Sequence, residues 1–183
     1  MKTYFVFLSL FVFTIQSHSQ HKQSLDVQIG LGLSYTDEDI DINGQGFYLQ
    51  GEYVYEVSKW IELRPYAGVV LTKARESDKV ALKNFRVSTN AFLLGGKVRL
   101  SIPIPWVAPY IELGIGGSLG KFQTVTSKIQ IDHGGTTYHI PFTLGVKFGR
   151  NHETDLALTY FFHNNKKQFA GAFAIGFSIP IRK

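Results

Sequence analysis

The chain has 183 residues, of which 44% are apolar, and it carries a formal net charge of +5 and no cysteine. This length suits a single domain, and the absence of cysteine excludes disulfide bonds and a lipid anchor on an N-terminal cysteine. By composition alone the chain resembles a soluble secreted protein, but the order of its residues indicates a different class of protein.

The N-terminal residues are typical of a secretory signal peptide. Lys2 precedes an apolar run over residues 4–15, which is followed by Ser17, His18 and Ser19. A cationic start, a short apolar stretch and small residues at the exit are the parts of such a signal. The run is shorter than the roughly twenty residues of a membrane-spanning helix. We therefore expect residues 1–19 to be removed and residues 20–183 to form the mature domain, with a retained anchor as the alternative.

From residue 25 onward, apolar residues alternate with polar or small ones. In residues 25–35 the apolar side chains from Leu25 to Tyr35 share one parity, and Asp26 and Gln28 lie on the other. A period of two predicts a β-strand, and strands of about nine to eleven residues are long enough to cross a membrane when tilted. The pattern recurs in residues 47–57, 61–71, 91–102, 109–119, 138–148, 155–163 and 169–181. Eight strands are predicted.

The breaks between these strands alternate in length. Long breaks cover residues 37–45, 73–86 and 121–137, and tight ones fall at residues 58–59, 103–105 and 150–153. Short turns at one end and long loops at the other are typical of transmembrane β-barrels. Trp60 and Trp106 lie beside short turns, where aromatic girdles occur. A soluble barrel or sandwich is the alternative, but it would have to expose the charged face of every strand on a small cylinder.

The chain resembles the small eight-stranded outer-membrane barrels of the OmpA/OmpX type, the single-domain outer membrane protein beta-barrel families of Gram-negative bacteria. The segments that carry the resemblance are KWIELRPYAGVVLT, WVAPYIELGIGGSLG and FAGAFAIGFSIPI. It implies an all-β, eight-stranded antiparallel up-and-down barrel in the cell outer membrane, a monomer delivered by the insertion machinery. Phe169, Phe173 and Phe177 fit the aromatic final strand of these families, whereas the ending at Ile181 departs from it.

The inward parity of the strands places charged residues in the short-turn half of the barrel. We expect a lumen charge network of Glu52, Glu56, Glu62, Arg64, Lys97, Arg99, Glu112, Lys147 and Asp155. The lumen of an eight-stranded barrel is just wide enough for side chains to fill, and buried charges are tolerated when they are paired. The sequence thus predicts a charged plug that blocks conduction; a narrow, porin-like pore is the alternative.

The other half of the lumen is predicted to hold small residues, aromatic rings and two histidines. Gly116, Ala170 and Ala172 could leave a ligand pocket open, or they could make room for the rings of Tyr48 and Phe161. Both possibilities remain open from the sequence.

Some barrels of this kind modify lipid A, as deacylases or acyltransferases. In the deacylases a His-x-Ser-Asn stretch supplies the base and the nucleophile, and the similar stretch here has His163 but Asn165 in place of the serine. Without a hydroxyl beside a base, no nucleophile is activated. We expect a non-enzymatic protein without a cofactor, and keep His163 and His139 as alternative catalytic residues.

Residues 36–46, TDEDIDINGQG, have the acidic spacing that opens a calcium-binding loop. Predicted strands flank the stretch, and position twelve of a loop that begins at Asp39, where an acidic ligand is required, is Gln50. We interpret Asn43-Gly44 as a turn at a hairpin tip, and keep Asp37, Asp39 and Asp41 as an alternative metal site.

The remaining long breaks are basic. We expect Lys73, Arg75, Lys79, Lys83, Lys166 and Lys167 to form an external rim that binds the phosphates of lipopolysaccharide. Nucleic acid is not expected, because the aromatic residues face lipid by parity. The leading hypothesis is a structural or surface-interaction barrel whose external loops meet lipid or a protein partner.

Overall fold

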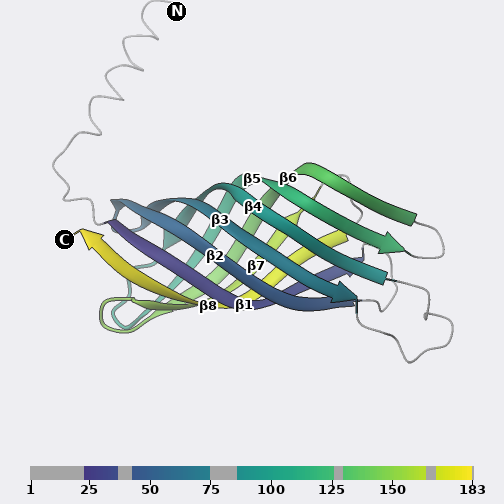
Figure 1. Ribbon diagram of the computed structural model, residues 1–183. Helices are drawn as coiled ribbons and strands as arrows, with labels where there is room; N and C mark the ends of the chain where they lie inside the picture. The colour runs from purple at the N-terminus through teal and green to yellow at the C-terminus, as the bar shows by residue number, and fades with distance from the viewer. Residues whose placement is uncertain (1–22, 37–42, 75–85, 126–129, 164–167, 183) are drawn as a thin grey trace, which may run out of the picture.

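The computed structural model describes residues 23–36, 43–74, 86–125, 130–163 and 168–182. Eight strands close into an antiparallel barrel in which each strand pairs with its sequence neighbours and β1 pairs with β8 (Figure 1). They are β1 (Gln23–Thr36), β2 (Asn43–Ser58), β3 (Ile61–Ala74), β4 (Arg86–Ser101), β5 (Val107–Val125), β6 (Gln130–Phe148), β7 (Thr154–Phe162) and β8 (Gln168–Arg182). The predicted eight-stranded antiparallel barrel is confirmed. Among the described residues there is no helix with the length and hydrophobicity that a bilayer-spanning helix requires.

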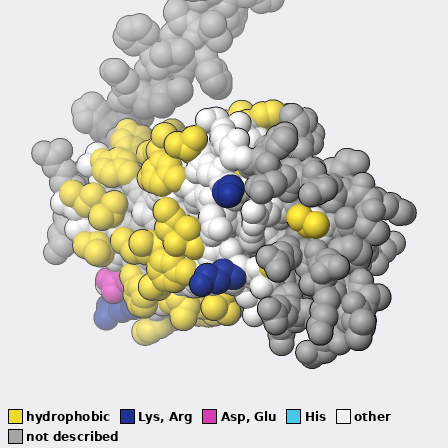
Figure 2. All heavy atoms as spheres, turned by 45° about the vertical axis from the view of Figure 1, so that its right-hand side comes forward, with side chains coloured by type: hydrophobic (Ala, Val, Ile, Leu, Met, Phe, Trp, Pro, Cys, Tyr) yellow, Lys and Arg dark blue, Asp and Glu magenta, His cyan; other side chains and the backbone are white. Residues whose placement is uncertain are grey.

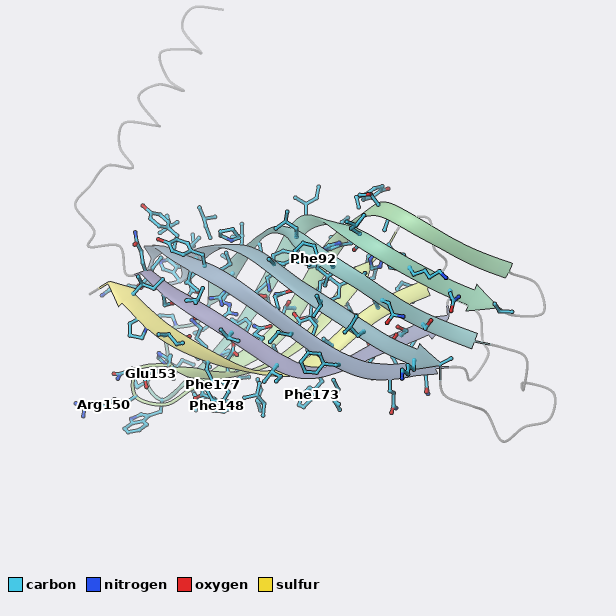
Figure 3. All side chains as sticks on the ribbon, viewed as in Figure 1. Phe92, Phe148, Arg150, Glu153, Phe173 and Phe177 are labelled. Atoms are coloured by element: carbon cyan, nitrogen blue, oxygen red, sulfur yellow. The ribbon has the colours of Figure 1, made fainter. Side chains whose placement is uncertain are left out.

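The alternation of the sequence becomes the two faces of the barrel wall. On β3, for example, Leu63 is 44% exposed and Leu71 is 47% exposed, whereas Arg64 and Val70 between them are fully buried. Successive side chains of a strand point to opposite faces, so the uniformly apolar parity faces outward and the parity that carries the polar residues fills the lumen. Phe148, Phe173 and Phe177 project from the outer wall (Figure 3).

An apolar belt surrounds the barrel. On β3 the outward residues stay apolar from Ile61 to Leu71, which matches the length of a tilted membrane-crossing strand, about nine to eleven residues. Trp60 and Trp106, each 63% exposed, lie at the short-turn end of the belt. The yellow surface in Figure 2 shows the belt giving way to other residues toward the opposite end.

Two predicted boundaries are wrong. The loop expected over residues 121–137 is largely strand, because β5 continues to Val125 and β6 begins at Gln130, with Lys121 opposite Gly134. Outside the lipid a strand no longer needs apolar residues on its outer face, so its sequence loses the period that reveals it. The hairpin of β5 and β6 consequently extends to the loop end of the barrel (Figure 1).

The interpretation of Asn43-Gly44 as a turn is also wrong. Both residues belong to β2 and lie opposite Tyr35 and Ser34 of β1. A Cβ atom on Gly44 would come within 2.5 Å of the carbonyl oxygen of Val87. Gly44 is therefore accounted for by the close approach of another backbone, a reason that the local sequence does not reveal.

The short turns lie where they were predicted. The turn between β6 and β7 carries Gly149 with a φ of 96° and His152 with a φ of 55°. The amide of Gly149 donates a hydrogen bond to the carbonyl of Trp106, which ties this turn to the one before β5. Arg150 and Glu153 lie at this end of the barrel (Figure 3).

Candidate functional site

Arg64 is the centre of an ion-pair network in the short-turn half of the lumen. Its Nε lies 2.5 Å from Glu52 Oε2 and 3.4 Å from Glu112 Oε1, and its Nη1 lies 2.5 Å from Glu62 Oε2. Its Nη2 donates to Asp26 of β1. The Arg64 side chain is fully buried. One guanidinium thus joins carboxylates from β1, β2, β3 and β5, which a planar group with five donors can do.

Two further cations from β4 extend the network. Lys97 Nζ pairs with Glu52 and lies 2.7 Å from Glu112 Oε2. Arg99 Nε lies 2.5 Å from Glu112 Oε1, so Glu112 accepts from both β4 cations. The guanidinium of Arg99 also stacks over the ring of Tyr110, 3.7 Å from its centroid. Such stacking adds a cation–π attraction to the ion pair.

The network closes around the barrel through β6 and β7. Lys147 Nζ lies 2.9 Å from Glu62 Oε1, and Arg99 Nη2 lies 3.4 Å from Asp155 Oδ2. Tyr110 donates a 2.7 Å hydrogen bond to the same Asp155 oxygen. A Cβ on Gly145 would lie 2.2 Å from the Tyr110 ring, so this glycine provides the space in which the ring lies.

Nine charged residues of the described part take part in these pairs. They are Asp26, Glu52, Glu62, Arg64, Lys97, Arg99, Glu112, Lys147 and Asp155. Eight of them are in the predicted network. Glu56, the ninth predicted member, is half-buried and lies opposite Glu62 in the β2–β3 pairing, at the border of the network. Asp26 was missed, although its inward parity in β1 was visible in the sequence.

The loop half of the lumen contains a chain of hydrogen bonds through both histidines. Tyr66 Oη lies 2.5 Å from His139 Nε2, and Ser118 Oγ lies 2.7 Å from His139 Nδ1. Ser118 Oγ also lies 2.9 Å from His163 Nε2. We call these four residues the histidine chain. All are buried, and Ser118 and His139 are fully so. The structure thus brings together both alternative catalytic residues and adds a serine that sequence reasoning did not place beside them.

Aromatic rings fill the space around the histidine chain. His139 packs edge-on against Phe161 at 5.3 Å between centroids, and Phe122 lies 5.0 Å from His163. Tyr48 lies 6.3 Å from Phe161.

The small residues of this half serve the rings. A Cβ on Gly116 would lie 2.3 Å from Tyr66 Oη and 2.7 Å from His139 Nε2, so Gly116 makes room for both groups. Ala170 and Ala172 pack in the same buried cluster as Tyr48 and Phe161. An apolar groove of about 680 Å³ lies on the outer wall instead, where it is lined by outward residues including Trp60, Leu100, Leu144 and Phe173.

The predicted external residues are described only in part. Lys73 is exposed near the loop end of β3. Arg75, Lys79, Lys83, Lys166 and Lys167 lie outside the described residues, as do Asp37, Asp39 and Asp41 of the alternative metal site. Within the described ranges, no group of three or more His, Asp or Glu side chains could hold a metal ion.

The sequence matches no known protein family and no curated protein, but the fold matches solved structures. Neisserial surface protein A is 12% identical over 88% of this chain and 97% of its own, with a TM-score of 0.55. The outer membrane enzyme PagL is 14% identical over 85% of this chain and 99% of its own, with a TM-score of 0.53. Ail, the attachment invasion locus protein of Yersinia pestis, is 15% identical over 88% of this chain and 100% of its own, with a TM-score of 0.50.

These likenesses are at the level of the fold. A closed sheet leaves no unpaired edge in hydrocarbon, and an outward apolar belt with a charged interior suits a bilayer and not water. The chain therefore has the eight-stranded outer-membrane barrel fold of the OmpA/OmpX type, and it is located in the cell outer membrane.

Proposed function

We propose that this barrel is a non-enzymatic outer-membrane protein with a structural or surface-interaction role, exerted through its external end, and with its lumen closed by a charged plug. The fold cannot decide the function by itself, because it is shared by an attachment protein and by an enzyme. The observation that supports the proposal is the filling of the lumen: an ion-pair network in one half and packed rings in the other.

The ion-pair network is what makes the plug. The Arg64, Glu52 and Glu112 side chains are completely buried and each contacts at least two partners. Removing a single partner from a buried pair leaves an uncompensated charge, which costs about 3–5 kcal/mol. A permeating ion would have to break several of these pairs together. The barrel should therefore be closed to ions despite its porin-like architecture.

Planar-bilayer recording tests the plug. The wild-type protein should give no steady current. The double variant Glu52→Ala/Arg64→Ala removes one acid and one base, so the charge balance is kept while the centre of the plug is lost, and it should show measurable ion flow. Leu63→Ala, which changes an exposed neighbour on the same strand, is the matched control and should stay silent. A steady ohmic current through the wild-type protein would contradict the plug.

The external end is proposed to meet lipopolysaccharide. Support comes from Lys73 and Lys121, both exposed near the loop end, and from the basic residues of the long breaks in the sequence. Phosphates are bound by such cations, and the attraction weakens with salt. Purified protein in neutral detergent should retain lipopolysaccharide at low ionic strength and release it as salt is raised. Retention of lipopolysaccharide that does not change with salt concentration would argue against a charged contact.

The insertion machinery is a second proposed partner. Phe173 and Phe177 of β8 face outward, 48% and 52% exposed, as an aromatic terminal strand requires. Replacing both by alanine should slow assembly of the barrel in cells, and the change from unfolded to folded mobility on a gel would measure it. Replacing Leu113 and Ile115 of β5, which are also exposed, is the control.

An enzyme acting on lipid acyl chains is the second candidate, favoured by one observation. Ser118 Oγ is within hydrogen-bond reach of His139 Nδ1, and the other ring nitrogen of His139, Nε2, lies within hydrogen-bond reach of Tyr66 Oη. A hydroxyl beside an oriented base is typical of an activated nucleophile. Complete burial of Ser118 opposes it. Incubation with lipid A, followed by mass spectrometry, separates the two functions. Under the leading proposal no acyl chain is lost or gained, whereas turnover that disappears in Ser118→Ala would establish the enzyme.

A further inference from the structure

On four adjacent strands, β2 to β5, the outward-facing side chains change from apolar to polar within one two-residue step toward the loop end. The last apolar residues with an exposed outward side chain on β2, β3, β4 and β5 are Phe47, Leu71, Phe92 and Leu119. The next outward residues toward the loop end are Gln45, Lys73, Asn90 and Lys121, all exposed. We call these four the polar row. A switch on four strands in succession marks the surface where hydrocarbon ends and lipid headgroups begin.

Within the polar row, Asn90 lies between two lysines. Leu71 of β3 pairs with Asn90 of β4, and Asn90 pairs with Lys121 of β5. Lys73 is the next outward residue after Leu71. Two strand spacings of about 4.8 Å and one two-residue step of about 6.7 Å place the Cα atoms of Lys73 and Lys121 roughly 12 Å apart.

Both lysines are available to a ligand. Neither Lys73 nor Lys121 has an ion pair or a hydrogen bond from its side chain to the described part of the chain. This contrasts with the lysines of the lumen, Lys97 and Lys147, which are paired with carboxylates. Figure 2 shows Lys and Arg side chains at the boundary between the yellow belt and the remaining surface.

We propose that Lys73, Asn90 and Lys121 form a binding site on the barrel wall for the phosphate of a membrane lipid whose acyl chains lie along Leu71, Phe92 and Leu119. This site deepens the proposed contact with lipopolysaccharide and rests on it, but it locates the contact on the strands and not on the loops. Each ammonium, on a flexible four-carbon stem, supplies a positive charge, and the Asn90 amide donates a further hydrogen bond to a phosphate oxygen.

A lipid suits the site better than a free anion does. An exposed lysine attracts a dissolved phosphate weakly, because water screens the charge and two flexible side chains must be ordered. A lipid brings its phosphate to this level of the membrane by burying its chains on the belt, so the headgroup meets the lysines at a high local concentration. The exposed Leu71, Phe92 and Leu119 side chains directly below the polar row provide that apolar surface.

Native mass spectrometry of the full-length protein in neutral detergent tests the site, with bis-phosphorylated lipid A as the probe. Lys73→Gln/Lys121→Gln removes both charges. Each lysine near an anionic lipid surface contributes about fivefold to affinity, so the double variant should bind lipid A about 25-fold more weakly than the wild type does. Lys59→Gln/Arg150→Gln removes two exposed charges at the short-turn end and should bind as the wild type does. Folding of every variant is checked by its mobility on a heat-modifiability gel.

Two further arms identify the ligand chemistry. Lipid A stripped of its phosphates should bind the wild type as weakly as lipid A binds the double variant. Inorganic phosphate, at the concentration of the lipid, should not displace lipid A. The site is overturned if the double variant keeps wild-type affinity for lipid A. If the double variant keeps its affinity but wild-type binding still requires the phosphates of lipid A, the proposed contact with lipopolysaccharide holds and lies elsewhere on the barrel. If dephosphorylated lipid A binds the wild type as well as lipid A does, both this site and the charged contact with lipopolysaccharide are wrong.

Discussion

In the short-turn half of the lumen, Arg64 pairs with four carboxylates, whereas in the loop half Ser118 touches two imidazoles within a shell of aromatic rings. The short-turn half is filled by charged side chains, which block the passage of ions only while they are paired with one another. The second resembles an ordinary protein core with one polar chain through it. A narrow barrel can therefore be closed by electrostatics or by packing, and the two kinds of closure respond differently to substitution.

Removing the central charge should have the largest effect. Arg64→Ala leaves Asp26, Glu52 and Glu62 without their shared cation, and the loss of one buried partner costs about 3–5 kcal/mol. We expect the free energy of unfolding in detergent micelles, measured by urea titration, to fall by this amount. Arg150→Ala, at the exposed short-turn end, is the control and should change it by less than about 0.5 kcal/mol.

Removing a ring from the loop half should cost less. Phe161 is 1% exposed and packs against Tyr48 and His139. Phe161→Ala loses buried apolar area and leaves a cavity, an effect of about 3 kcal/mol. The same urea titration measures it, with Phe162→Ala on the outward parity as the control. If Phe161→Ala destabilised the barrel more than Arg64→Ala does, packing in the loop half would contribute more to stability than the ion pairs of the short-turn half.

Breaking the histidine chain should have an intermediate effect of about 1–2 kcal/mol. Ser118→Ala removes the hydroxyl that His139 and His163 share, and a buried polar group that loses its partner keeps its desolvation cost. Ser118→Cys retains a weak donor and should recover part of the loss. Equal stability of Ser118→Ala and the wild type would show that the imidazoles find other partners.

The sequence predicted the faces of the wall better than the ends of the strands. The period of two in β3 and β4 assigned Arg64, Lys97 and Arg99 to the lumen, because inside a membrane every second side chain must avoid lipid. Beyond the lipid that constraint ends, and β5 and β6 were cut short at Lys121 and Thr137. The meeting of Ser118 with His139 and His163 joins β5, β6 and the end of β7; it depends on register between strands, which parity does not supply.

Gln28 lies where the two halves of the lumen meet, and its replacement should have the smallest effect, with the opposite sign. It is opposite Gln50 in β2 and Gly176 in β8, it is fully buried, and neither amide atom has a partner among the described residues. A buried amide without partners loses its hydration and gains no hydrogen bond to compensate. Gln28→Leu should therefore leave the free energy of unfolding unchanged or raise it by up to about 1 kcal/mol. Gln50→Leu is the informative contrast, since Gln50 Nε2 donates to Glu52 at 2.5 Å, and its loss should destabilise the barrel. A clear destabilisation by Gln28→Leu, seen in the same urea titration, would mean that polar contacts run unbroken from the ion-pair network to the histidine chain, and the division of the lumen into two independent halves would be lost.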